Sequence, residues 1–199
     1  MFAPAELLWA LIGLILTIGA TWLEVFVTNA PWAWFQSGVQ FYSLKVSFQV
    51  GAVLFTGCMG GPNAAALSQV AYLSLGLVLF QTFGLQVFTQ GGGLSYLREP
   101  SFGYLLGFIP AAWACGFLAF RYGPKLEKLA LSCLGGLIFI HGVGIIYLLL
   151  AYGLRWVGTP NLSLGEALLK YSVFPLPGQL VVVCAVSVLA YVMRRLMFY

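Results

Sequence analysis

The feature that most constrains this chain is a series of long apolar stretches with hardly any charged residue. A helix needs about 20 such residues to cross the hydrocarbon core of a bilayer, and in that core only helices and closed barrels satisfy their backbone hydrogen bonds. Of the 199 residues, 61% are hydrophobic and only 7% are charged, whereas soluble domains carry about 25% charged residues. The sequence therefore predicts an all-α, polytopic membrane protein forming a single integral membrane domain over residues 1–199. Six spans are expected, at residues 7–26, 46–61, 64–83, 102–120, 129–154 and 173–193.

The segments between these stretches predict the connections. Gly60-Gly61-Pro62-Asn63 is typical of a helix stop followed by a tight turn, so the second and third spans are expected to form a hairpin. Residues 84–101 hold three consecutive glycines and a proline and predict a shaped loop. Residues 29–45 are expected to run along the membrane surface, and 155–172 to form a connector. The first stretch has no small-residue cleavage pattern and is interpreted as a retained helix.

Basic residues indicate which ends face the cytoplasm, because cytoplasmic loops are enriched in Lys and Arg. With both termini inside, the inner side holds Arg121, Lys125, Lys128, Arg194 and Arg195. The outer side then holds Lys45, Arg98, Arg155 and Lys170, spread over longer segments. This topology places the glycine loop outside. No basic stripe is present, which argues against nucleic acid as a partner.

The residue inventory excludes several classes of protein. All five acids are glutamates, and the chain has no Ser–His–Asp arrangement, no H-E-x-x-H and no Walker A pattern, so neither an enzyme nor an ATPase is expected. The four cysteines, Cys58, Cys115, Cys133 and Cys184, fall in separate apolar stretches without a C-x-x-C pair. They are interpreted as small apolar fillers, with no metal site.

His141 is the ionisable residue that lies clearly inside a predicted span, with glycines on both sides that would let another helix approach closely. It can be a neutral residue hydrogen-bonded across helices. It can also be a proton relay, although a relay needs further ionisable stations.

Several blocks of the sequence resemble the BioY family, the biotin-specific S components of energy-coupling-factor transporters. They are Val46–Gln49, Gln69–Gly76, Gln86–Gly93, Pro100–Phe108 and Phe174–Leu180. The resemblance implies six helices, cytoplasmic termini and an outward-facing biotin pocket in the cell membrane. It also implies partners, namely a transmembrane T component and ATPase subunits. Biotin would be the transported ligand, with no cofactor.

The last helix departs from that family. The resemblance implies an aspartate and, three residues later, a lysine that hold biotin; here these positions are Gln179 and Val182. Gln179 still offers one acceptor and two donors for a neutral ureido ring. A ligand carboxylate would have to use Arg98, Lys170, backbone amides or solvent.

The candidate ligand contacts follow from the loop and from the resemblance. Bare backbone at Gly91, Gly92 and Gly93 can approach a ligand closely, although a plain linker remains the alternative. Tyr96 and Tyr104 can wall a pocket or simply anchor the interface, and Gln49 can contact ligand or cap a turn.

For docking to the T component, Gly13, Thr17 and Thr21 recur at four-residue spacing and give a smooth helix face; packing within the chain explains the same spacing. The sequence thus predicts a vitamin-binding S component. Two alternatives stay open: the same fold with a different small ligand, or a subunit or assembly factor of a membrane complex that transports nothing.

Overall fold

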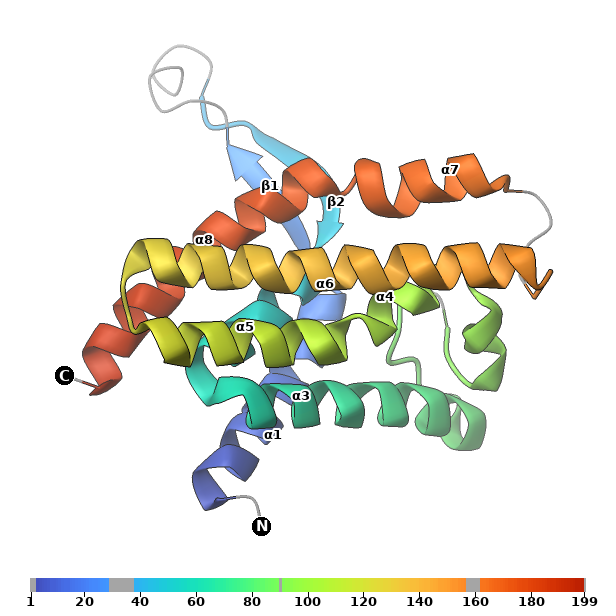
Figure 1. Ribbon diagram of the computed structural model, residues 1–199. Coiled ribbons are helices and arrows are strands. Elements are labelled where there is room, and N and C mark those ends of the chain that lie inside the picture. The colour runs from blue at the N-terminus through green and yellow to red at the C-terminus, as the bar shows by residue number, and fades with distance from the viewer. Residues whose placement is uncertain (1–2, 29–37, 90, 157–161, 199) are drawn as a thin grey trace.

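The computed structural model describes residues 3–28, 38–89, 91–156 and 162–198 (Figure 1). Its elements in chain order are α1 Pro4–Thr21, β1 Glu24–Thr28, β2 Phe41–Ser47, α3 Gln49–Phe83, the 3-10 helix η2 Leu94–Arg98, α4 Phe102–Leu106, α5 Phe108–Tyr122, α6 Leu126–Gly153, α7 Leu164–Leu168, the π-helical turn η3 Leu169–Val173 and α8 Leu176–Phe198. Within the described residues, five helical segments are long and apolar enough to cross a membrane. The all-α membrane class is confirmed, with five such segments where six were expected.

The difference in number lies in α3, which folds back on itself. At Gly61 the backbone has φ 82° and ψ 176°, and Pro62 follows. The Gln49 amide donates to the Tyr72 hydroxyl at 2.7 Å, although 23 residues of straight helix would separate them by about 35 Å. The two arms are therefore antiparallel, as the hairpin prediction requires. The first arm, of only about 12 residues, rises about 18 Å, too little to cross a bilayer on its own.

The first predicted span was too long at its end. α1 ends at Thr21, and Glu24–Thr28 forms a strand that pairs antiparallel with Phe41–Ser47, with Phe26 opposite Ser43. The β-branched and aromatic residues from Val25 onward favour a strand over a helix. The stretch predicted at 29–45 ends in the strand β2, and residues 29–37 lie outside the described residues. Its course along the membrane surface stays a prediction.

The connector predicted at 155–172 differs from the structure in its second half. There the chain is already helical, because α7 and η3 lead into α8. Ser163 caps α7: its hydroxyl accepts from the Glu166 amide at 3.3 Å, and the Glu166 carboxylate accepts from the Ser163 amide at 2.8 Å. This capping box can be recognised in the sequence from the motif Ser-x-x-Glu. The π-helical turn precedes Pro175, which lacks an amide donor, and Figure 1 shows the bend between α7 and α8 there.

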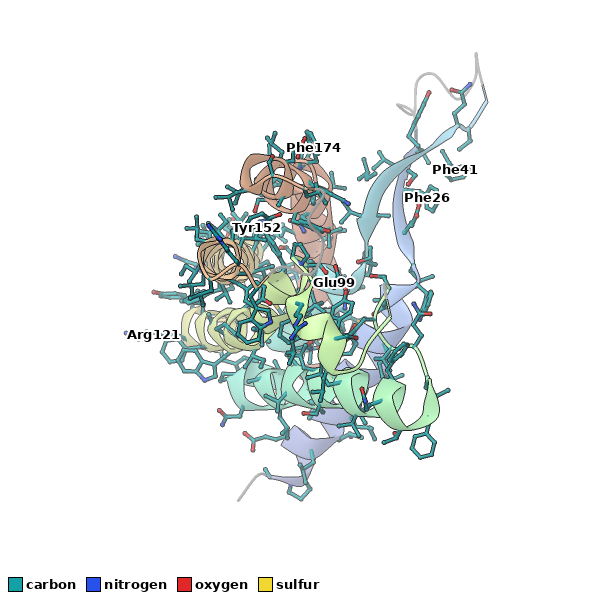
Figure 2. All side chains as sticks on the ribbon, turned by 90° about the vertical axis from the view of Figure 1, so that its right-hand side faces the viewer. Phe26, Phe41, Glu99, Arg121, Tyr152 and Phe174 are labelled. Carbon is teal, nitrogen blue, oxygen red and sulfur yellow. The ribbon has the colours of Figure 1, made fainter. Side chains whose placement is uncertain are left out.

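Glycines let α3, α5 and α6 approach one another closely. A Cβ at Gly116 of α5 would lie 2.7 Å from the backbone of Gly61, and one at Gly136 of α6 would lie 2.5 Å from the Leu54 side chain. These helices lie side by side in Figure 1. The glycine loop, α4 and the start of α7 lie at one end of the bundle. The α5–α6 turn and the C-terminus lie at the other. Figure 2 views the first of these ends, where Glu99 and Tyr152 are labelled.

Candidate functional site

A buried polar pair joins α6 and α8. His141 Nε2 lies 2.7 Å from Gln179 Oε1, and the two residues are 9% and 7% exposed. Because an amide oxygen only accepts, Nε2 carries the hydrogen and donates it. The other ring nitrogen, Nδ1, is buried and has no hydrogen-bond partner among the described residues. The interpretation of His141 as a residue hydrogen-bonded across helices is therefore correct.

Tyr104 of α4 covers this pair. Its ring packs edge-on against the His141 imidazole with centroids 5.8 Å apart, and its hydroxyl meets the Ser172 hydroxyl at 2.5 Å. A Cβ at Gly144 would lie 2.5 Å from the Tyr104 ring, so a glycine one turn after His141 makes room for that ring. We call His141, Gln179, Tyr104 and Ser172 the polar cluster. Its members come from four separate elements of the chain.

The glycine loop packs against the second arm of α3. Gly92 and Gly93 are buried, and the Gly93 amide donates to the Gly76 carbonyl at 3.2 Å. A Cβ at Gly92 would come within 2.7 Å of both the Gly76 carbonyl oxygen and Phe80. Gly91 has φ 115°, a conformation that favours glycine. The loop is thus fixed to the bundle by backbone contacts that only glycine permits, and it is no plain linker.

Tyr96 and Gln49 lie in a second group, beneath this loop. Phe88 connects them: its ring contacts Tyr72 at 5.3 Å and Tyr96 at 4.9 Å, and the Tyr72 hydroxyl accepts from Gln49. Tyr96 is only 4% exposed, so it is a packed residue and no interfacial anchor. Burial raises the pKa of Tyr96, which keeps its hydroxyl neutral. We call Gln49, Tyr72, Phe88 and Tyr96 the aromatic group.

The start of α3, which carries Gln49, packs on α8, which carries Gln179. A Cβ at Gly51, two residues after Gln49, would lie 2.9 Å from Val182 of α8. Val182 is 0% exposed. The position at which the resemblance implies a lysine is thus part of the apolar core. Of the seven candidate ligand residues, Gln179 and Tyr104 thus belong to the polar cluster, Gln49 and Tyr96 to the aromatic group, and Gly91, Gly92 and Gly93 to the glycine loop.

The stripe on α1 faces inward. Thr17 and Thr21 are 0% and 3% exposed, and a Cβ at Gly13 would lie 2.4 Å from Thr56 of α3. The Gln69 amide donates to the Thr17 hydroxyl at 3.1 Å. Packing within the chain, the alternative left open above, accounts for Gly13, Thr17 and Thr21, and a partner cannot dock on them while α1 stays against α3. The exposed face of α1 carries Leu7, Leu8, Leu11 and Ile15 instead.

Sequence reasoning missed Ser172, Tyr72 and Phe88, because their roles depend on contacts between distant segments. It also missed the convergence of three cysteines, Cys58, Cys115 and Cys133. Spacing rules detect only ligands that are close together in the sequence.

The fold defines a class: the chain is built like an S-component of an ECF-type ABC transporter. A solved structure titled as the S-component for biotin from an ECF-type ABC transporter superposes with a TM-score of 0.67, covering 96% of this chain and 90% of that one at 22% identity. The model of the BioY family matches residues 25–198, and the chain belongs to the BioY family.

Relatives by sequence agree with this assignment. An uncharacterized 21.2 kDa protein of Cyanophora paradoxa is 31% identical over 81% of this chain and 80% of its own length. A probable biotin transporter BioY of Lysinibacillus sphaericus is 39% identical, over about half of each chain (53% and 52%). The biotin transporter BioY of Rhodobacter capsulatus is 29% identical over 75% of this chain and 78% of that one.

Proposed function

We propose that this chain is the substrate-binding component of a biotin uptake system and not an enzyme. In this proposal it binds biotin at the outer side of the cytoplasmic membrane. It delivers the vitamin with a transmembrane T component and ATPase subunits, which supply the energy. Membership of the BioY family and the biotin transporters among its relatives support this function.

The observation that carries the ligand assignment is the buried His141–Gln179 bond. It leaves Gln179 Nε2 with two donor hydrogens and His141 Nδ1 with an unused lone pair. A cyclic urea, such as the ureido ring of biotin, has a carbonyl that accepts and N–H groups that donate. Gln179 would donate to the urea carbonyl, and an N–H of the ring would donate to His141 Nδ1. Neither contact requires a charge on the protein, which suits an uncharged ring in an apolar environment.

Tyr104 is the residue that must move for this to happen, because its ring lies against His141 and its hydroxyl is held by Ser172. We infer that Tyr104 swings aside from His141 and then stacks on the bound ring. The glycine loop, with Tyr96 behind it, would form the outer wall. Gln49 would support this wall through Tyr72 and Phe88 and would not touch the ligand itself.

The carboxylate of biotin needs a cation, and Lys170 is a suitable one. Its ammonium lies 5.3 Å from the centre of the Tyr171 ring, and that ring is 6.1 Å from the Tyr104 ring. Lys170 is exposed, as a group that meets a ligand from the aqueous side should be. From η3 it would take over the role of the lysine that the resemblance implies at position 182.

Sidedness is part of the proposal. Arg121, Lys125, Lys128, Arg194 and Arg195 belong to the α5–α6 turn, its flanks and the end of α8, at the end of the bundle away from the glycine loop (Figure 1). Enrichment of basic residues on the cytoplasmic side supports a cytoplasmic C-terminus and an outward-facing loop.

Uptake of radiolabelled biotin tests the function. The chain is expressed in a biotin-requiring bacterium without its own transporter, together with an ECF module of T component and ATPases. The proposal expects uptake that requires the chain and stops when the ATPases are inactivated by mutation. Uptake at the level of cells without the chain, despite confirmed membrane insertion, would refute it.

The replacement of a lysine by the core residue Val182 favours one rival, the same fold with a different small ligand. Mass spectrometry of molecules released by heating the purified protein separates the two. Biotin in the extract supports the proposal, and another compound at one per chain supports the rival.

A further inference from the structure

Three of the four cysteines meet in the middle of the bundle. Cys58 lies on α3, Cys115 on α5 and Cys133 on α6, and each is 0% exposed. The Cys58 Sγ is 3.6 Å from the Sγ of Cys115 and 3.6 Å from that of Cys133. All three sulfurs lie within 4.8 Å of one another. Cys133 is eight residues before His141 on α6, about 12 Å along the helix, so this group is separate from the polar cluster.

The size of this sulfur triangle matches a metal ion. An ion bound equally to three sulfurs sits at the centre of their triangle. With two edges of 3.6 Å and a third edge of up to 4.8 Å, that centre is about 2.0–2.4 Å from each sulfur, and metal–thiolate bonds in proteins are about 2.3 Å. The thiols already stand where a three-coordinate ion would hold them.

The surrounding helices keep this arrangement fixed. Cβ atoms added at Gly57 of α3 and Gly136 of α6 would each lie 3.2 Å from the Cys115 Cβ, so two glycines hold the neighbouring helices close to Cys115. An isolated buried cysteine is usually a small apolar filler. Here three helices each direct a thiol to one point, an arrangement that the role of a single filler does not explain.

We propose that Cys58, Cys115 and Cys133 form a three-sulfur site for a soft monovalent metal ion, Cu(I). Soft thiolates select Cu(I), which accepts three sulfur ligands. Structural zinc takes four protein ligands, and among the described residues this group of His, Cys, Asp and Glu side chains has only three members.

Cu(I) is bound by thiolates, so each coordinating thiol would release its proton. The ion with two thiolates carries a net charge of −1, and with three thiolates a net charge of −2. Arg194, only 7% exposed, donates a hydrogen bond of 3.0 Å to the Ala119 carbonyl of α5, one helical turn after Cys115, and its guanidinium lies over the Phe120 ring. This buried cation is close enough to the three sulfurs to offset part of the negative charge.

Anaerobic competition for Cu(I) tests the site. The reduced, purified chain is titrated against a chromophoric Cu(I) chelator, and Cys58→Ser, Cys115→Ser and Cys133→Ser are compared with Cys184→Ser. Cys184 is exposed and outside the triangle, so it is the matched control. The proposal expects one Cu(I) per chain for the unmodified chain and for the control, and affinity weaker by roughly tenfold or more in the other three.

Two further measurements keep the test decisive if a variant folds poorly. X-ray absorption of the unmodified, copper-loaded chain should show sulfur alone around the metal. Failure to take Cu(I) from the chelator, nitrogen or oxygen neighbours at the metal, or equal weakening by Cys184→Ser would overturn the proposal. The second measurement is disulfide mapping of protein purified with air excluded and with no reductant added. A disulfide at Cys58 would also overturn the proposal. Biotin binding is not needed for any of these outcomes.

Discussion

The replacement Gln179→Leu tests the polar cluster most sharply, because it removes one partner of a buried hydrogen bond and leaves the other in place. The His141 Nε2–H would then be buried without an acceptor. An unsatisfied buried donor costs about 1–3 kcal/mol, and we expect the free energy of unfolding to fall by that amount. Loss of the amide that meets the urea carbonyl should weaken biotin binding by roughly 5- to 150-fold, the same energy expressed as affinity.

The double replacement His141→Leu with Gln179→Leu separates stability from binding. Removing both partners leaves no buried group without a hydrogen-bond partner. The double variant should therefore lose about 0.5–3 kcal/mol less stability than the two single variants lose in sum. Biotin binding should stay lost. Gln69→Leu, a buried glutamine between α1 and α3, is the control and should retain binding. Thermal unfolding and calorimetry measure both quantities; additive stability effects, or a double variant that binds biotin normally, would contradict the reasoning.

Three further predictions concern the loop, the carboxylate and the sidedness. Gly92→Ala should destabilise the chain by about 1–3 kcal/mol, because its Cβ would meet the Gly76 carbonyl oxygen and Phe80 at 2.7 Å. Gly142→Ala, which has open space around it, should not destabilise the chain in the same unfolding assay. Lys170→Ala should weaken biotin binding by roughly twofold to fivefold and leave the affinity for biotin amide, which has no carboxylate, unchanged; an equal effect on both ligands would exclude Lys170 as the carboxylate contact. In intact cells, with the exposed native cysteine replaced, a membrane-impermeant thiol reagent should label Ser163→Cys and spare Lys125→Cys, and the reverse pattern would invert the proposed topology.

The membrane helices could be predicted from the sequence because lipid imposes a simple rule of length and apolarity. Runs such as 129–154 and 102–120 are recovered as α6 and as α4 with α5. The reversal at Gly61-Pro62 was predictable for the same kind of reason, since glycine and proline interrupt a helix by local chemistry. The three glycines of the loop likewise indicated a position where side chains do not fit.

The errors occurred where local patterns compete. Residues 22–28 are apolar enough to extend a span, but β-branched and aromatic residues there pair with β2 as a strand. Residues 164–172 contain polar groups and were assigned to a connector, although the capping box at Ser163 and Glu166 indicated a helix start. Length and hydropathy outweighed these weaker signals in the prediction.

Contacts between distant segments were the part that sequence reasoning could not supply. The pairing of His141 with Gln179 spans 38 residues, and that of Cys58 with Cys133 spans 75. Neither leaves a periodic pattern, because each depends on how helices rotate about their axes when they pack. The inward face of Gly13, Thr17 and Thr21 is a similar case. Small residues indicate a close helix contact, but they do not indicate whether the opposing helix belongs to the same chain or to another subunit.

Equilibrium dialysis of the purified chain against radiolabelled biotin, in mild detergent and without other subunits, is the most direct measurement. The account predicts saturable retention of one biotin per chain at micromolar ligand or below, displaced by unlabelled biotin. Retention no greater than that of an unrelated membrane protein, from a preparation that unfolds cooperatively, would contradict the central claim that this bundle holds a cyclic urea between His141 and Gln179.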